Sequence, residues 1–337
     1  MDYRLPAEFE PQSFVQLIFP HPDSDWAPYL EEASHTFVSI ATTIASYQSC
    51  LIICDDIARV KAYFHNSDNI FFVTASTNDT WARDCSAITT INTRTNTPKI
   101  LDFTFTGWGN KFESERDNAL TSHLKQYYNA PYQKERLILE GGAIESNGEG
   151  LLLTTQTCLL NPNRNTKLTQ KSELETILKT LLGIEKTLWL DHGFLEGDDT
   201  DSHIDTLARF VNKDTIAYVQ CNNPDDIHYH ELQAMERELH AFTDQEGTPL
   251  HLIPLPMCDP IYFEGERLPA TYANFLIINN AVLVPTYNDP HDQEALNILT
   301  NVFKNHDVIG IDCSVLIRQH GSLHCVTMQF PEALTLI

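Results

Sequence analysis

The amino-acid sequence predicts an α/β fold in which five similar units form a closed, pseudo-fivefold ring within one domain, residues 1–337. Two observations predict this ring. A helical stretch followed by a short apolar strand occurs five times along the chain, and β-hairpins lie between these pairs. The units recur at intervals of roughly 50–85 residues, which is typical of a repeat architecture. A length of 337 residues also allows two domains, but a closed ring of repeats makes one domain the better prediction.

The helix and strand pairs are identified by their apolar spacing. The first unit opens with a strand, Ser13–Phe19, and continues with a helix over about Trp26–Tyr47, whose apolar residues recur at helical spacing, and the buried strand Cys50–Cys54. Four further pairs are expected at Leu120–Tyr128 with Leu137–Leu139, Glu173–Leu182 with Thr187–Leu190, Glu231–Phe242 with Leu250–Ile253, and Glu294–Phe303 with Val308–Ile311.

Turn-forming residues between apolar runs identify the hairpins. We expect them at Asp84–Ile91 with Lys99–Thr106, Ala143–Glu145 with Leu151–Thr155, Thr206–Val211 with Ile216–Gln220, and Tyr272–Ile278 with Val282–Pro285. Polar clusters precede or begin these hairpins, and a last one precedes the C-terminal strand. Equivalent ends of the units in a ring meet at its centre, so these clusters are expected to share one pocket. They are Thr77–Asp84, Glu140–Glu145, Glu196–Asp205 and Arg318–Cys325.

The charge balance favours a cationic ligand. Acidic side chains number 46 against 22 basic ones, which gives a net charge of −24. This charge argues against a nucleic acid or an anionic membrane surface as partner. No stretch approaches the about 18 apolar residues of a membrane span, and the first residues lack the pattern of a signal peptide. We therefore expect a cytoplasmic protein.

Cysteine and histidine spacing gives no metal or disulfide signature. The eight cysteines are scattered and form no C-x-x-C pair, so most are expected to be reduced and buried. Only His228 with His230 and His320 with His324 have ligand-like spacing, and neither pair combines with cysteines or carboxylates in a recognised metal-binding motif. We expect neither a metal nor an organic cofactor.

The acidic stretch Glu196–Asp205 has three possible interpretations. It is a solvated acidic loop, a metal site, or one wall of a pocket for an organic cation. In the third interpretation, His203 and Asp205 lie two residues apart on an extended backbone and point to the same face.

Two other clusters suit a planar cation. Asp84 is either in a local ion pair with Arg83 or, with the aromatic face of Trp81 nearby, part of a cation site. Glu140 precedes two glycines, where the backbone can approach a ligand closely, although a solvated carboxylate at a strand end is equally consistent with the pattern.

Cys325 is the candidate nucleophile. Most cysteines in proteins are buried and chemically inert. Cys325 is the one cysteine of the chain that follows a polar loop with glycine and histidine and precedes a strand-like run. Its neighbour His324 is expected to point to the opposite face of the strand. His203, from another unit, is therefore the better candidate base.

Five motifs together resemble the agmatine deiminase family, which includes the bacterial type of peptidylarginine deiminase. They lie at Thr80–Asp84, Leu139–Glu145, Asp201–Phe210, Leu268–Phe275 and Gly321–Cys325, and the likeness covers about Phe14–Pro331. The family belongs to the guanidino-group-modifying enzymes, so the resemblance implies a five-bladed α/β propeller, the pentein fold. It also implies a homo-oligomer, most simply a dimer.

The resemblance implies a role for each candidate residue. Cys325 is the implied nucleophile, and His203 with Glu140 handles protons. Asp84 and Asp205 hold the guanidinium, Trp81 and Trp108 form aromatic walls, and Asp199 faces the distal amine of the substrate. Chemistry agrees, because a planar guanidinium matches paired carboxylates and its resonance-stabilised carbon requires a thiolate nucleophile.

The expected reaction is hydrolysis of agmatine to N-carbamoylputrescine and ammonia through a covalent thiouronium on Cys325, within polyamine and putrescine biosynthesis. A second cation on the substrate suits the acidic loop, whereas the carboxylate of free arginine would require a basic partner, and only Arg83 and Arg318 are available. The alternatives are a deiminase of arginine or peptidylarginine, and a catalytically silent cation-binding protein.

Two segments depart from the family pattern. Cys85-Ser86 replaces a common Gly-Pro, and Gln319–Ser322 replaces a run of glycines and an asparagine. Neither change removes a candidate catalytic group, but both are expected to alter the shape of the pocket.

Overall fold

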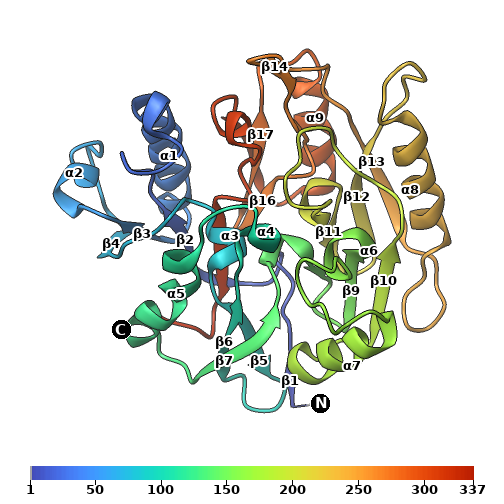
Figure 1. Cartoon of the computed structure of the whole chain (residues 1–337), viewed down its shortest axis with the longest axis horizontal. Coiled ribbons are helices and arrows are strands. Elements are labelled where there is room, and N and C mark those ends of the chain that lie inside the picture. The colour runs from blue at the N-terminus through green and yellow to red at the C-terminus, as the bar shows by residue number, and fades with distance from the viewer. Residues whose placement is uncertain (1) are drawn as a thin grey trace.

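The computed structural model describes residues 2–337, which form an α/β fold (Figure 1). Within this range, five sheets of three or four strands repeat one pattern, in which an antiparallel pair is followed by a strand parallel to its second member. The five core triplets are β19-β2-β3 (Thr327–Pro331, Gln12–Ile18, Ser49–Cys54), β5-β6-β7 (Ile88–Asn92, Pro98–Thr104, Tyr132–Ile138), β8-β9-β10 (Glu145–Ser146, Leu151–Thr155, Lys186–Leu190), β11-β12-β13 (Ala208–Asn212, Thr215–Gln220, His251–Pro256) and β16-β17-β18 (Leu276–Ile278, Ala281–Thr286, Asp307–Asp312).

Smaller strands extend this pattern. β4 (Ile70–Thr74) lies beside β3, β1 (Tyr3–Arg4) lies beside β5, and β14 (Tyr262–Phe263) pairs with β15 (Glu266–Arg267) in a separate hairpin. The sheet of β19 and β2 joins the two ends of the chain, since β19 is C-terminal and β2 is N-terminal.

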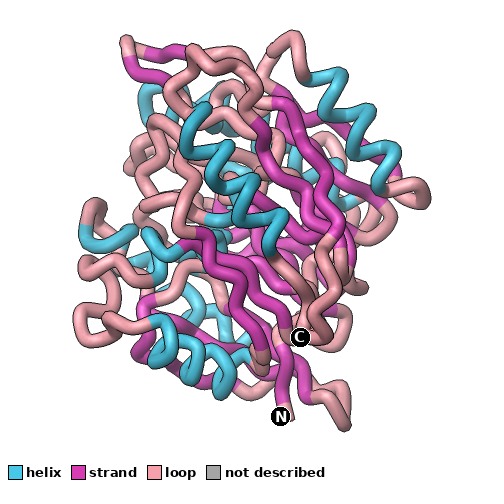
Figure 2. The backbone as a smooth tube through the Cα atoms, turned by 90° about the vertical axis from the view of Figure 1, so that its right-hand side faces the viewer, coloured by secondary structure: helices cyan, strands magenta, loops and turns pink. Residues whose placement is uncertain are grey.

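The parallel connections contain the long helices, as a parallel crossover requires. They are α1 (Leu30–Ala45), α5 (Glu115–Leu124), α7 (Lys171–Leu182), α8 (Tyr229–Ala241) and α9 (Asp292–Val302). Figure 1 shows these helices around the outside of the strands, and the perpendicular view in Figure 2 shows the same packing of helices beside strands. α1, for example, buries Phe37, Ile40 and Ile44 completely. No helix within residues 2–337 has both the length and the apolar character needed to cross a bilayer.

The five predicted pairs of helix and strand are confirmed, with different boundaries in the second pair. α5 begins at Glu115, before the predicted Leu120, because its polar first turn carries no apolar signal. β7 spans Tyr132–Ile138, longer than the predicted Leu137–Leu139, because most of its side chains are at least partly exposed and the strand has no apolar run. The short helices α2 (Ile57–Lys61) and α6 (Gln156–Leu159) were not predicted.

The predicted starts of three hairpins are wrong in the same way. Asp84 lies in the one-turn helix α3 (Ala82–Cys85), Ala143 in the 3₁₀ turn η3 (Gly141–Ala143), and Thr206 in the 3₁₀ turn η4 (Ile204–Thr206). α3 contacts η3, and η3 contacts η4, so the turns bring three of the polar clusters together. In Figure 1, α3 and α4 (Gly107–Asn110) lie near the middle of the molecule. These turns, rather than strand ends, position the candidate site.

Candidate active site

A pocket opens where these turns meet, and most of the predicted site residues line it. Trp81, Asp84, Trp108, Asp199, His203 and Cys325 are among its lining residues. Asp205 and Glu140 are fully buried directly behind it. The remaining lining residues are Asp25, Asp79, Phe112, Asp198, Thr200, Thr206, Gln319, His320 and Gly321. The sequence therefore identified one pocket from residues in four separate polar clusters.

Asp84 is held at the pocket wall by donors from two other segments. Trp108 Nε1 donates to its Oδ2 at 2.9 Å, and the backbone N–H of Gly142 donates to its Oδ1 at 2.9 Å. A Cβ atom on Gly142 would lie 2.6 Å from His203 Nδ1 and 2.9 Å from Asp84 Oδ1. Only glycine fits there, which explains physically why the Gly141-Gly142 pair follows Glu140.

Asp205 presents one free carboxylate oxygen. Its Oδ2 pairs with His324 Nδ1 at 2.6 Å, whereas its Oδ1 is buried without a hydrogen-bond partner among residues 2–337. Burial raises the pKa of Asp205, but the hydrogen bond and positive charge of His324 offset this and hold that pKa below its ordinary value. An ionised carboxylate with a buried, unpaired oxygen is costly unless a donor arrives, so this oxygen is suited to bind a cation.

The nucleophile candidate lies beside that carboxylate. Cys325 Sγ is 4.0 Å from Asp205 Oδ2 and 3.4 Å from Asn274 Oδ1, and the residue is only 7% exposed. Burial raises the pKa of the Cys325 thiol well above its usual value, and the charges of Asp205 and Asp84 raise it further. These surroundings therefore favour the protonated thiol, and a cation bound between the two aspartates would favour its ionisation.

His203 and Glu140 lie on the other side of the cluster. His203 Nδ1 is 3.6 Å from Asp84 Oδ1. Burial lowers the pKa of His203, but Asp84, Cys158 and Glu140 together raise it to about 10. Its backbone precedes the 3₁₀ turn η4, so the extended geometry predicted for His203 and Asp205 is wrong, although the structure does bring both side chains to the site.

The aromatic walls are two tryptophans from separate segments. Trp81 and Trp108 meet edge to face with ring centroids 6.4 Å apart. Trp108 has a left-handed backbone, φ 55° and ψ 47°, between two glycines that also have positive φ. A bulky residue in this region carries strain of about 1–3 kcal/mol, which here accompanies the hydrogen bond from its indole to Asp84.

The acidic stretch is partly structural. Asp198 shapes the loop by accepting hydrogen bonds from the backbone of Thr200 at 3.1 Å and of Ser202 at 2.7 Å. Asp201 pairs with Lys111 at 2.9 Å and with Arg164 at 2.7 Å. Asp199 remains available at the pocket mouth with a side chain that is 44% exposed, 4.0 Å from His320 Nδ1.

Sequence reasoning missed four residues that support the site. Arg164 Nε donates to both oxygens of Glu140, at 2.9 and 3.0 Å. Asn274 Oδ1 accepts from the backbone of His324 at 2.9 Å. His324 links Asp205 to Glu8, whose Oε2 lies 2.7 Å from His324 Nε2 and 2.9 Å from Arg209. Asn274 and His324 lie inside recognised motifs, but no local pattern indicates their partners.

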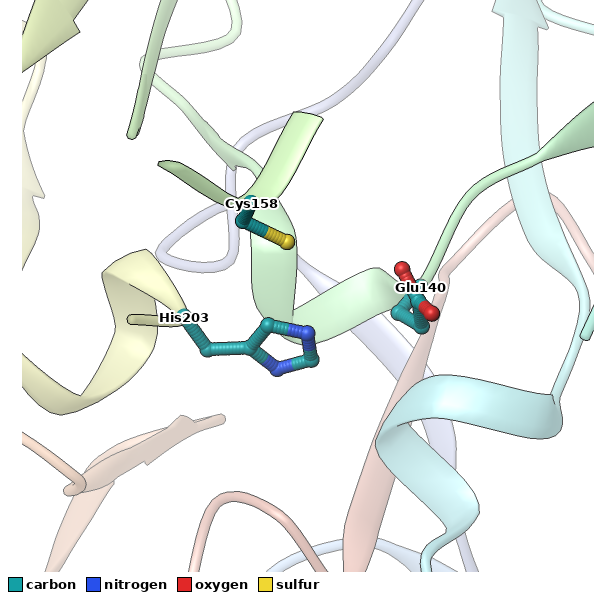
Figure 3. Close-up of side chains that lie close together, drawn as sticks. All are labelled: Glu140, Cys158 and His203. Atoms are coloured by element: carbon teal, nitrogen blue, oxygen red, sulfur yellow. The ribbon is translucent and has the colours of Figure 1, made fainter. Parts of the chain in front are cut away.

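Two groups of described residues have metal-type ligands. One is Asp259, Asp289 and His291 near the surface, and the other is Glu140, Cys158 and His203 in the interior (Figure 3). In the interior group, Arg164 already donates to both oxygens of Glu140. All eight cysteines are free and buried, as expected.

The chain is similar to known deiminases over nearly its whole length. A family model described as Porphyromonas-type peptidyl-arginine deiminase matches residues 4–331. The agmatine deiminase of Pseudomonas aeruginosa is 30% identical to the chain, over 98% of this chain and 95% of the relative.

Solved structures of agmatine deiminases are also similar to the chain over nearly its whole length. A C. jejuni agmatine deiminase, in a cysteine-to-serine variant with substrate bound, is 42% identical with a TM-score of 0.91, over 97% of this chain and 96% of that one. The agmatine deiminase of Enterococcus faecalis is 27% identical with a TM-score of 0.89, over 98% and 96%. DDAH from Pseudomonas aeruginosa, 14% identical with a TM-score of 0.50 over 95% and 100%, shares the fold alone.

Proposed function

The chain belongs to the Porphyromonas-type peptidyl-arginine deiminase family, and from that premise we propose that it hydrolyses agmatine to N-carbamoylputrescine and ammonia. One observation carries the proposal. A buried thiol, Cys325, lies beside a carboxylate with a free buried oxygen, Asp205, at the inner end of a pocket whose outer end is also acidic. A molecule with a guanidinium at one end and an amine at the other matches both ends.

The guanidinium is held between the two inner aspartates. Its N–H groups donate to Asp205 Oδ1 and to Asp84; both carboxylates lie beside Gly142, where an added Cβ would be 2.9 Å from Asp84 Oδ1 and 3.2 Å from Asp205 Oδ2. Bidentate carboxylate contacts match the planar fork of a guanidinium in charge and in geometry. The bound cation stabilises both carboxylates in the ionised form, and it lowers the pKa of the Cys325 thiol.

The first half of the reaction forms a covalent intermediate. Once the bound cation has lowered its pKa, the Cys325 thiol loses its proton to water, the resulting thiolate attacks the guanidinium carbon, and the C–N bond to one terminal nitrogen breaks. His203, which is protonated at neutral pH, gives its proton to that nitrogen, so ammonia leaves and a thiouronium remains on Cys325.

The second half of the reaction hydrolyses the intermediate and regenerates the free enzyme. A water molecule gives one proton to His203 and its oxygen attacks the thiouronium carbon; the C–S bond then breaks, and the remaining proton on that oxygen passes to the Cys325 thiolate, which leaves the ureido product and the free thiol. Glu140, fixed by Arg164, supplies the negative charge that stabilises the imidazolium of His203.

The outer end of the pocket favours agmatine over arginine. Among the described residues that line the pocket, none is a lysine or an arginine, whereas Asp25, Asp79, Asp198 and Asp199 all are lining residues. The two arginines considered in the sequence are engaged elsewhere: Arg318 pairs with Glu32 at 2.7 Å, and Arg83 is buried against Glu8. An ammonium is therefore attracted where a carboxylate would be repelled.

A parallel assay tests this proposal. Purified protein is given agmatine, free arginine and an arginine-containing peptide at equal concentrations, and formation of the ureido group is measured. We expect agmatine to have the highest kcat/KM. A higher kcat/KM for either of the other substrates would overturn the substrate assignment, and absence of ureido product with all three would overturn the deiminase assignment.

The finer architecture is also a proposal. We infer that the five sheets are the blades of a five-bladed propeller within one domain, because all five repeat one strand pattern and the first sheet joins β2 to β19 from opposite ends of the chain. We further propose a homodimer in solution, which light scattering of the purified protein would test.

A further inference from the structure

His203 has one ring nitrogen whose environment the proposed reaction leaves unexplained. Nδ1 faces Asp84, but Nε2 is buried and has no hydrogen-bond partner that meets geometric criteria among residues 2–337. The residue is only 1% exposed, so bulk water does not take the place of a partner. Buried polar atoms without partners are rare in folded proteins, and one on a residue that transfers protons requires an explanation.

Two polar groups lie on the Nε2 side of the ring. Figure 3 shows the sulfur of Cys158 and the carboxylate of Glu140 on the side of the ring where its second nitrogen points. The ligand atoms of these three residues lie within 4.8 Å of one another. Both oxygens of Glu140 already accept from Arg164 Nε. Arg164 already neutralises Glu140, whereas the Cys158 sulfur has no other side-chain partner among residues 2–337, so Cys158 is the neighbour that we take to pair with Nε2.

Cys158 and His203 are also tied together through the backbone. The Thr155 hydroxyl accepts from the backbone N–H of Cys158 at 3.3 Å and donates to the carbonyl of Ser202 at 2.7 Å. Ser202 immediately precedes His203, and its left-handed backbone, φ 66°, is one that a non-glycine residue adopts only when its surroundings require it. The Thr155 side chain therefore links the segment that carries the Cys158 thiol to the segment that carries the His203 imidazole.

We propose that Cys158 is a positioning residue for His203, whose thiol partners Nε2 and keeps Nδ1 directed toward Asp84 and the reacting guanidinium. A thiol suits this role because it donates weakly through S–H to a neutral imidazole and accepts weakly through sulfur from an imidazolium. The same partner thus serves both charge states of the ring during the reaction. The proposal rests on the role of His203 in the proposed function.

A metal site is the competing interpretation of the same three residues, since sulfur, nitrogen and oxygen ligands suit zinc. Arg164 argues against it, because its positive charge already occupies Glu140. The charges around His203 agree with the positioning role. Burial raises the pKa of Cys158, which keeps it a neutral thiol, and the groups facing His203 are Asp84, Glu140 with Arg164, Asp205 and Cys158 itself.

Three substitutions separate positioning from packing. Cys158→Ser keeps a group that donates and accepts, whereas Cys158→Ala and Cys158→Val remove it. We expect Cys158→Ser to keep kcat within about threefold of the wild type, and the other two to lose roughly 10- to 100-fold in kcat with little change in KM. The limb of the pH–rate profile that reports His203 is expected to move to lower pH in Cys158→Ala, because the Cys158 sulfur no longer accepts a hydrogen bond from the imidazolium.

Simple packing predicts the opposite order, because a hydroxyl buried in apolar surroundings destabilises and an apolar group does not. Retention of kcat in Cys158→Ala or Cys158→Val, with loss in Cys158→Ser, would overturn the proposal. The matched controls are Cys50→Ser and Cys50→Ala, since Cys50 is fully buried in β3 and its pKa is raised by burial alone. At Cys50 we expect the order that packing predicts, in which the serine variant loses more than the alanine variant.

A second measurement keeps the two proposals separate. The ¹⁵N signals of the His203 ring, followed by NMR against pH, are expected to titrate at a lower pH in Cys158→Ala than in the wild type and in Cys158→Ser. Identical titration in all three proteins would overturn the positioning role even if the wild type deiminates agmatine. A shift in a protein that produces no ureido group would retain the positioning role and reject the deiminase assignment.

Discussion

The inner end of the pocket, around Cys325, and its outer end, around Asp199, differ in how firmly the fold holds their side chains. At the inner end, Asp205 and Glu140 are fully buried, and each has a charged partner within 3.0 Å. At the outer end, Asp199 has a side chain that is 44% exposed, and His320 Nδ1 lies 4.0 Å from its carboxylate.

This difference separates chemistry from substrate choice. The inner groups arrive from several turns and are locked by neutral and charged hydrogen bonds, as preorganised reaction chemistry requires. Asp199, at the outer end, lies on a loop where water screens its charge, so it is worth little alone. Substitutions at the inner end should therefore reduce kcat strongly, and substitutions at the outer end should change KM modestly.

The largest effect is expected for Asp205→Asn. The change removes the buried charge that faces the guanidinium and leaves His324 Nδ1 with a neutral partner. We expect kcat/KM for agmatine to fall by roughly 10³-fold, the scale seen when a preorganised electrostatic group is removed. Thermal unfolding would show that the variant is folded. A folded variant that loses less than about tenfold in kcat/KM would contradict the proposed difference between the inner and outer ends of the pocket.

A smaller effect is expected for Trp108→Phe. This variant keeps an aromatic wall but loses the N–H that donates to Asp84 Oδ2 at 2.9 Å. We expect kcat/KM to fall about tenfold. A factor of ten corresponds to a free energy of about 1.5 kcal/mol, which is the contribution of one hydrogen bond to a charged group. Trp189→Phe is the matched control, because its N–H donates to Glu175 away from the pocket, and it should leave steady-state kinetics unchanged.

The outer end gives the next prediction, for Asp199→Asn. An exposed ion pair contributes about 1 kcal/mol or less, so KM for agmatine should rise by about fivefold at most while kcat stays constant. KM for free arginine, whose distal ammonium is neutralised by its own adjacent carboxylate, should rise less than KM for agmatine. A loss confined to kcat would place Asp199 in the chemistry and contradict the division of the pocket.

The smallest effect concerns pH. Burial is the main cause that raises the pKa of Asp79 to about 6, so this outer carboxylate becomes protonated as the pH falls through 6 and no longer attracts a cation. The pKa of Asp205 is instead held low, so the inner end stays charged. We expect KM for agmatine to rise roughly twofold between pH 7 and pH 5, and Asp79→Asn to remove that rise. An equal rise in Asp79→Asn would show that another group is responsible.

The reactive groups could be predicted from the sequence because each lies in a short motif. Cys325, His203, Glu140, Asp84 and Asp205 were all expected at one site, and the structure brings them together. The five pairs of helix and strand were predictable for a similar reason, since apolar spacing along a few residues reports a helix or a buried strand directly.

The supporting residues could not be predicted in this way. Glu8 and His324 are 316 positions apart in the chain, and Arg209 is needed to neutralise Glu8. Nothing local to any of them indicates a shared buried network. The helical turns that carry Asp84 and Asp205 were missed because polar residues next to an apolar run look like the start of a strand.

The central claim is that Cys325 forms a covalent bond to the guanidinium carbon. Turnover of agmatine would be stopped with acid and the protein digested for mass spectrometry, with Cys325→Ala treated in parallel. We predict a mass increase equal to agmatine less ammonia on the peptide that contains Cys325, and no turnover in Cys325→Ala. Undiminished turnover in Cys325→Ala, or the same mass increase on a different cysteine, would contradict the account.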